Sequence, residues 1–109
     1  MNELPAFFSS ARHEIEPILA SVGFCLATLH YDPEAFGSSY TEYTRRGGRF
    51  RLVWDGKEEA LYGVVRGDVG EWQDVEAAMP TPTRPFDKDT SPERLARLAA
   101  AVQSFYRAK

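Results

Sequence analysis

Four arginines lie in the stretch TRRGGRFR, residues 44–51, of a chain whose net charge is −3. Guanidinium groups that share one surface can bind a phosphate or a carboxylate through paired hydrogen bonds. Gly47 and Gly48 indicate the tight turn of a β-hairpin, because glycine adopts the positive φ of a primed turn without steric cost. The stretch therefore fits both an anion-binding patch and an exposed hairpin turn whose arginines are only solvated.

The turn would also decide which side chains share a face. With both glycines as turn residues, Arg46 pairs with Arg49, Thr44 pairs with Arg51, and Glu42 lies diagonal to Arg51. Alternation along the strands then sends one set to the core, namely Tyr43, Phe50, Leu52 and Trp54, with Arg45 near the turn. The open face receives the predicted partner- or anion-binding set, which is Arg46, Arg49, Arg51 and Tyr40, together with Val53. An acidic partner would relieve the repulsion between Arg46 and Arg49.

Other residues that could do chemistry are scattered. His13 is expected on the polar side of a helix, His30 near a strand end, and Cys25 as a buried, inert thiol. Asp32 and Glu34 in YDPEAFG are typical of a turn, although they could form a carboxylate pair. The sequence contains no phosphate loop, dinucleotide fingerprint, nucleophile elbow or zinc-binding spacing. We predict no catalytic residue, no cofactor and no metal site.

The first element that positions the hairpin is a helix. Its apolar residues recur every three or four positions, namely Leu4, Phe7, Phe8, Ala11, Ile15, Ile18, Leu19 and Val22. Asn2 is the expected N-cap and Gly23 the expected C-terminal cap. Pro17 removes a backbone hydrogen bond, so we expect a kink or a break near His13.

Strands follow this helix. The run FCLATLHY, residues 24–31, is apolar on both faces and predicts a strand in the interior of the sheet. Residues 40–45 and the RFRLVW run form the hairpin, and ALYGVV, residues 60–65, is the fourth strand. A three-residue loop before it would turn Ala60, Tyr62 and Val64 to the core, whereas a two-residue loop would turn Leu61, Gly63 and Val65 there. We favour the first because it places no glycine opposite Phe50.

The remaining chain is an acidic segment, a Pro-rich strap at 79–91 and a second helix. In DVGEWQDVEAAM we expect Trp72 and Val75 to pack down, and the acidic residues Asp68, Glu71, Asp74 and Glu76 to stay in water. Ser91-Pro92 marks the helix start. Its apolar stripe is Leu95, Leu98, Ala99, Val102, Phe105 and Tyr106, and Arg94, Arg97 and Arg107 are expected on the polar side. The predicted fold is α+β, a two-layer structure with a four-stranded antiparallel meander covered on one face by the N- and C-terminal helices.

Composition fits one globular domain over residues 1–109, with 43% hydrophobic and 27% charged residues. A negative net charge argues against duplex DNA as a partner, because that binding needs many Lys and Arg residues. The N-terminus lacks a signal-peptide pattern, and no apolar run reaches the length of a membrane span. We expect a cytoplasmic protein that does not bind membranes.

The segments GFCLATLHYDPEAFGSSY and RFRLVWDGKEEALYGVV, followed by an acidic EW, resemble a recurrent pattern in small bacterial proteins of uncharacterised function. The likeness covers about residues 15–76. It rests on the Gly-Phe strand start, the YDPEAFG motif and the R-x-R strand. It implies a bacterial cytoplasmic protein and no known activity, so it assigns no functional residue. Small acidic α+β proteins also include toxin-immunity proteins, an analogy of fold and charge only.

These observations favour a non-enzymatic protein-interaction module, immunity-like or adaptor-like, that uses the open sheet face or the acidic segment at 68–76. A protein partner or self-association is expected, and the exposed sheet is compatible with a homodimer. The first alternative is binding of a phosphate-bearing ligand or single-stranded nucleic acid at the arginine hairpin, with Tyr40 stacking on a base. The second is a small enzyme with a pocket between the sheet and the Pro-rich strap, lined by His30, Asp32 or Glu34.

Overall fold

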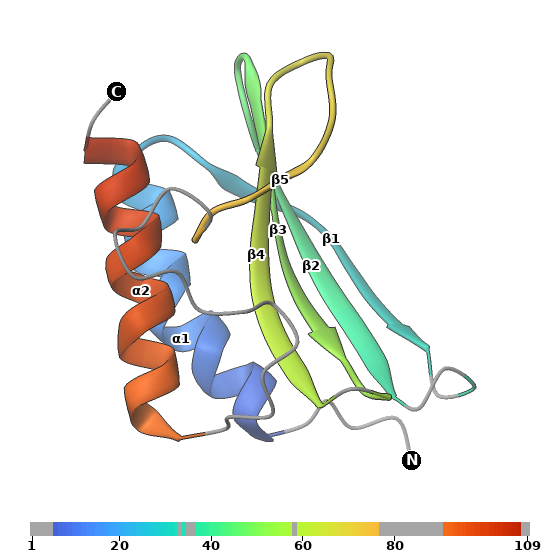
Figure 1. The fold of residues 1–109 in the computed structure, drawn as a ribbon. Coiled ribbons are helices and arrows are strands. Elements are labelled where there is room, and N and C mark those ends of the chain that lie inside the picture. The colour runs from blue at the N-terminus through green and yellow to red at the C-terminus, as the bar shows by residue number, and fades with distance from the viewer. Residues whose placement is uncertain (1–5, 33, 35–36, 58, 77–90, 108–109) are drawn as a thin grey trace.

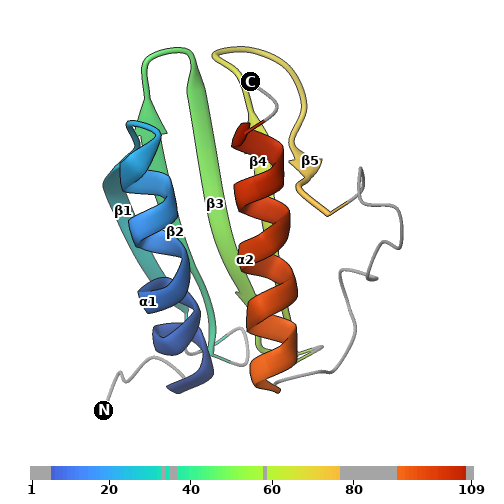
Figure 2. The ribbon, with the colours of Figure 1, turned by 90° about the vertical axis from the view of Figure 1, so that its left-hand side faces the viewer.

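A computed structural model describes residues 6–32, 34, 37–57, 59–76 and 91–107. Its elements are α1 (Ala6–Ser21), β1 (Cys25–Asp32), β2 (Ser38–Arg45), β3 (Gly48–Asp55), β4 (Ala60–Arg66), β5 (Gln73–Asp74) and α2 (Pro92–Arg107). The strands form one antiparallel sheet in the order β1-β2-β3-β4-β5. Both helices lie side by side on the same face of the sheet and run in the same direction (Figures 1 and 2). The predicted two-layer α+β fold is confirmed, with β5 as an additional short strand.

Helix α1 is held by its apolar stripe and by its C-terminal cap. Phe8, Ala11, Ile15 and Leu19 are buried against the sheet. Gly23, with φ of 95°, ends the helix in a Schellman motif in which Gly23 N donates to Ala20 O at 3.1 Å and Phe24 N donates to Leu19 O at 2.9 Å. The helix continues as one element through Pro17, so of the two expected alternatives, a kink or a break near His13, the break is wrong. The expected N-cap, Asn2, lies outside the described residues.

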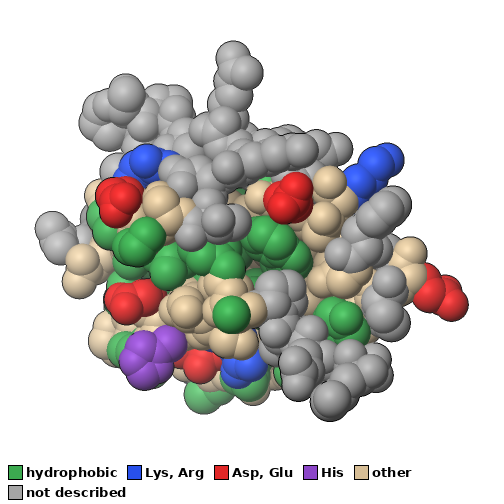
Figure 3. Space-filling view, turned by 90° about the horizontal axis from the view of Figure 1, so that it is seen from below, with side chains coloured by type: hydrophobic (Ala, Val, Ile, Leu, Met, Phe, Trp, Pro, Cys, Tyr) green, Lys and Arg blue, Asp and Glu red, His purple; other side chains and the backbone are tan. Residues whose placement is uncertain are grey.

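Helix α2 begins as the sequence predicts. Ser91 Oγ accepts a hydrogen bond from Arg94 N at 3.2 Å, and Pro92 occupies the first helical position. The buried side of the helix includes Leu98, Val102 and Tyr106. Seen from below, hydrophobic side chains gather near the middle of that face of the molecule, with most charged side chains nearer its rim (Figure 3).

The buried surface of α2 also contains an arginine. Arg94 is fully buried, and its NH1 and NH2 atoms donate to the two carboxylate oxygens of Glu76 at 3.0 and 2.6 Å. NH2 also donates to Leu61 O at 2.7 Å. The predictions that Arg94 faces solvent and that Glu76 stays in water are therefore wrong. Pairing of β5 with β4 carries the chain after Asp74 into the layer beneath α2, where Glu76 meets this guanidinium.

The β2–β3 turn differs by one position from the expected one. Arg45 pairs with Gly48, so Arg46 and Gly47 are the turn residues, and only Gly47 has positive φ, at 79°. Thr44 therefore faces Arg49, and the predicted Arg46–Arg49 pair does not form. Each residue of β2 therefore pairs with a residue of β3 two positions away from the predicted one. Because side chains alternate between the two faces with a period of two, the predicted faces are unchanged. The core-facing set of the hairpin, Tyr43, Phe50, Leu52 and Trp54, is accordingly buried.

The side of strand β4 that faces the core is not the one that we favoured. Asp55 pairs with Ala60 across a four-residue connection, which turns Leu61, Gly63 and Val65 inward. A Cβ atom on Gly63 would lie 2.8 Å from Cζ of Phe50. The glycine is needed because the Phe50 ring fills the space that a side chain would take, so the preference for a register without a glycine near Phe50 was wrong.

Strand β1 is an edge strand rather than an interior one. In the part of the chain that the structure describes, it pairs only with β2, and residues 25–30 are all exposed, including Cys25. Leu26 and Leu29 are each 49% exposed. The apolar sequence of the strand therefore did not predict burial, and the expected inert, buried thiol is a surface thiol.

Candidate functional site on the open sheet face

The helix-free face of the sheet carries side chains in rows that cross the strands. One row contains His30, Tyr40, Val53 and Tyr62. The next, toward the β2–β3 turn, contains Thr28, Glu42, Arg51, Val64 and Asp74. The last contains Thr44, Arg49 and Arg66. We call these residues, together with Asp32, Asp55 and Trp72, the open face.

Two predicted residues of this face, Arg49 and Arg51, share one carboxylate. Arg51 Nε donates to Glu42 Oε1 at 2.6 Å, and Arg49 NH1 donates to Glu42 Oε2 at 3.0 Å. Burial alone would raise the pKa of Glu42, but the hydrogen bonds and charges of Arg51 and Arg49 outweigh it and hold that pKa below its usual value. Glu42 therefore lies directly opposite Arg51, not diagonal to it, and fixes both arginines.

Aromatic rings enclose Arg51. Its guanidinium carbon lies 4.7 Å from the centroid of the Tyr40 ring and 4.7 Å from that of Trp72. Trp72 also contacts Arg66, at 5.0 Å, and Tyr40 stacks on His30 with 5.1 Å between centroids. The result is a continuous row across the sheet, which we call the stacked row: His30, Tyr40, Arg51, Trp72 and Arg66. Cations over aromatic faces are attracted by the ring quadrupole, so these contacts hold the side chains of the row in place.

Three members of the stacked row were not in the predicted partner- or anion-binding set, and of these His30 was considered only as part of an enzyme pocket. Trp72 was expected to pack toward the core, and Arg66 was assigned no role. The short β5 pairing places Trp72 beside β4 on the open face instead. No local pattern in the sequence indicates a two-residue strand, so only the pairing could have revealed this position.

Arg46, the remaining predicted arginine, lies in the turn and is exposed. It extends the positive end of the open face but does not face Arg49. The neighbouring Arg45 points to the helix layer, as expected. Its NH1 donates to Val22 O at 2.7 Å, and its guanidinium carbon lies 4.8 Å from the ring of Phe24.

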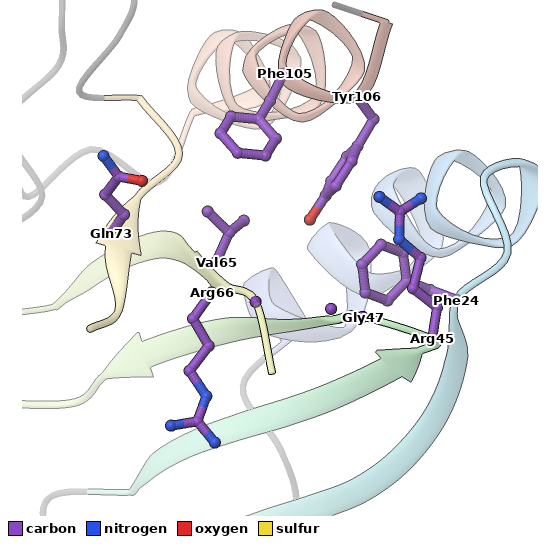
Figure 4. A pocket seen from close by; sticks show the side chains of 10 residues that line it. Phe24, Arg45, Gly47, Val65, Arg66, Gln73, Phe105 and Tyr106 are labelled. Carbon is purple, nitrogen blue, oxygen red and sulfur yellow. The ribbon is translucent and has the colours of Figure 1, made fainter. Parts of the chain in front are cut away.

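A cavity of about 160 Å³ lies beside Arg45 at this end of the sheet. Tyr106 and Phe105 of α2 line it, and Figure 4 shows Val65 pointing toward the helices while the Arg66 side chain points away from them. Burial raises the pKa of Tyr106 to about 12, against the opposing effect of Arg45. We interpret this cavity as a small packing gap between α2 and the hairpin turn, where Arg45 stabilises the C-terminal end of α1.

A wider hollow of about 240 Å³ lies at the opposite end of the strands. Its lining includes His30, Asp32, Tyr40, Asp55 and Tyr62. Burial, followed by the charges of Asp55 and Asp74, raises the pKa of Tyr62. His30 and Asp32 thus do share a hollow, whereas the Pro-rich strap that was expected to close it falls largely outside the described residues.

The positions of His30, Asp32 and Glu34 give little support to the alternative of a small enzyme. His30 stacks on Tyr40, Asp32 Oδ1 accepts a hydrogen bond from Glu34 N at 3.0 Å, and Glu34 is exposed. This is the turn chemistry that the YDPEAFG motif indicated, not a catalytic pair. Among the residues that the structure describes, no three His, Cys, Asp or Glu side chains come together as a metal ion would require.

Comparison with protein-family models, with curated proteins and with solved structures found no match to this chain. Neither helix in the described part of the chain is long and apolar enough to span a membrane.

Proposed function

We propose that this chain is a non-enzymatic protein-interaction module, of an adaptor or immunity type, and that the open face is its binding surface. The observation that carries the proposal is the position of Arg51 between Tyr40 and Trp72 on the face of the sheet opposite the two described helices (Figure 1). Trp, Tyr and Arg are the residue types that contribute most binding energy at protein interfaces.

Preorganisation supports the same proposal. A long arginine side chain normally loses rotamer freedom on binding, at a cost of roughly 0.5–1.5 kcal/mol. Arg51 has already lost much of that freedom, because Glu42, Tyr40 and Trp72 hold it in one orientation. A partner would therefore meet a surface whose central side chains need little reordering.

The test is affinity capture from the native host with the immobilised protein. The wild type is expected to retain a stoichiometric partner, or a second copy of itself, and the variant Tyr40→Ser plus Trp72→Ser is expected to lose it. His13→Ser plus Ala100→Ser, at exposed positions of the helix layer, is the matched control and should behave as the wild type. Circular dichroism of all three proteins separates lost binding from lost folding. Capture of no partner, together with no self-association, would contradict the proposal.

A second candidate is binding of a phosphate-bearing ligand or single-stranded nucleic acid. Arg49 faces Arg66 across β3 and β4, which concentrates positive charge beside the Trp72 ring. Glu42 weakens this reading, because it neutralises part of that charge. Salt-sensitive binding of a fluorescent oligonucleotide that is lost in Arg46→Glu plus Arg49→Glu would favour this function, whereas unchanged binding in the variant would remove the arginines from the site.

A further inference from the structure

We propose that the open face binds a second copy of this chain. In this dimer the two sheets stack face to face, and each end of one open face lies over the opposite end of the other. This inference rests on the proposed function, because it names the partner of the same surface.

Charge is segregated along the strands of the open face. Asp32 and Asp55 lie at the end of the sheet where β1 and β3 finish. Arg49 and Arg66 face each other at the opposite end, and Arg46 lies beyond them in the turn. The rows between these ends are uncharged or mixed. Among the side chains of the strands themselves, one end of the face is therefore acidic and the other is basic, although exposed Asp68 and Glu71 follow Arg66 in the chain and exposed Lys57 follows Asp55.

Two identical sheets can stack with a twofold axis along the strands or across them. An axis along the strands would place the basic end, with Arg49 and Arg66, over the basic end of the other copy. The acidic ends, with Asp32 and Asp55, would meet in the same way. An axis across the strands places the basic end of each copy over the acidic end of the other. Electrostatic complementarity selects the second arrangement, and like-charge contacts oppose the first.

The hollow at the acidic end gives the basic end a place to bind. A guanidinium is planar, donates hydrogen bonds to carboxylates and stacks on aromatic rings. The hollow offers Asp32 and Asp55 together with the rings of Tyr40 and Tyr62. The arginine that enters it would come from the turn end of the other copy, where Arg46 is exposed and the Arg49 side chain is 41% exposed.

The area of the open face indicates how tightly the two copies should bind. Four strands about 4.8 Å apart, each of seven or eight residues rising about 3.3 Å, cover on the order of 500 Å² in projection. The accessible surface of a corrugated face exceeds its projection, so the face offers at most an area of the order of the roughly 800 Å² per partner of a standard interface. We therefore expect a dimer in the micromolar range whose dissociation constant rises with salt.

Sedimentation equilibrium from about 1 µM to about 1 mM protein tests the arrangement through complementary charge reversals. Variant A, Arg46→Glu plus Arg49→Glu, makes both ends of the face acidic. Variant B, Asp32→Lys plus Asp55→Lys, makes both ends basic. Each variant alone is expected to dimerise at least tenfold more weakly than the wild type, and an equimolar mixture of A and B is expected to form a heterodimer of near wild-type strength.

The control Glu14→Lys plus Glu93→Lys makes the same change in net charge as variant B, but on exposed positions of the helix layer, and should dimerise as the wild type. If a double variant fails to fold, Arg46→Glu alone can be used for the same measurement, because this turn side chain is exposed. A monomeric wild type, retained homodimers of A and B, or failure of their mixture to associate would each overturn the inference. Capture of a different protein through the open face by a monomeric wild type would leave the proposed function standing.

Discussion

Glu42 and Arg51 face each other directly across β2 and β3, with 2.6 Å between Oε1 and Nε. The same carboxylate binds Arg49, so one acidic side chain orients two arginines of the open face.

Replacing Glu42 with Gln should lower the free energy of unfolding by about 1 kcal/mol at neutral pH, because the arginines that it pairs with are partly exposed and screened. The pKa of Glu42 is lowered in the folded state, so its stabilisation is present above the unfolded value of 4.5 and is lost as pH falls through the folded value. Urea unfolding as a function of pH checks this. The curves for wild type and Glu42→Gln should converge in acid, and parallel curves would contradict the prediction.

Replacing Arg94 with Met should destabilise the protein by about 3–5 kcal/mol, because Glu76 would remain buried without its partner. The double variant Arg94→Met plus Glu76→Leu should recover most of that loss. A double-mutant cycle measured by chemical denaturation gives the coupling. Additive losses would show that the two side chains do not depend on each other.

Replacing Gly63 with Ala should cost about 1–3 kcal/mol, because the new methyl group would overlap the Phe50 ring. Gly67→Ala is the matched control, since a Cβ there meets nothing nearer than 3.7 Å. Thermal unfolding of both variants provides the measurement. Phe50→Leu in the Gly63→Ala background should cost less than Phe50→Leu alone, and equal costs would argue against the overlap.

The Tyr43 hydroxyl accepts a hydrogen bond from Thr41 Oγ1 at 2.9 Å and donates one to Glu16 Oε2 at 2.7 Å. Burial raises its pKa, and Glu16 adds to that rise. A raised folded pKa means that stabilisation is complete below the unfolded value of 10 and is lost as pH increases through the folded value. Tyr43→Phe should therefore lose about 1–2 kcal/mol at neutral pH and show a shallower alkaline decline than the wild type. Urea unfolding from about pH 8 to about pH 11 measures both the loss of stability and its alkaline decline. Equal alkaline slopes for the wild type and Tyr43→Phe would contradict the prediction.

The sequence predicted the fold and much of the open face, because both depend on local regularities. Alternation along β2 and β3 placed Tyr40, Arg49 and Arg51 together even though the turn was misplaced, since a shift of two partners preserves the face. Other features depend on contacts between distant segments. Helical periodicity counts Arg94 as polar, and only the path of the chain after β5 brings Glu76 to it. Likewise, the apolarity of β1 does not reveal whether another element covers the strand.

Strand β1 contributes no residue to the buried core, and among the described strands only β2 pairs with it. It can therefore separate from the sheet while the packing between the helices and the other strands stays intact, in an opening that exposes little additional apolar surface. Amide hydrogens of Leu26 to Tyr31 should exchange with solvent faster than those of β3, at a rate set by this local opening and not by global unfolding. Opening of β1 would therefore carry Thr28, His30 and Asp32 away from the rest of the open face, while β2, β3 and β4 stay packed on the core.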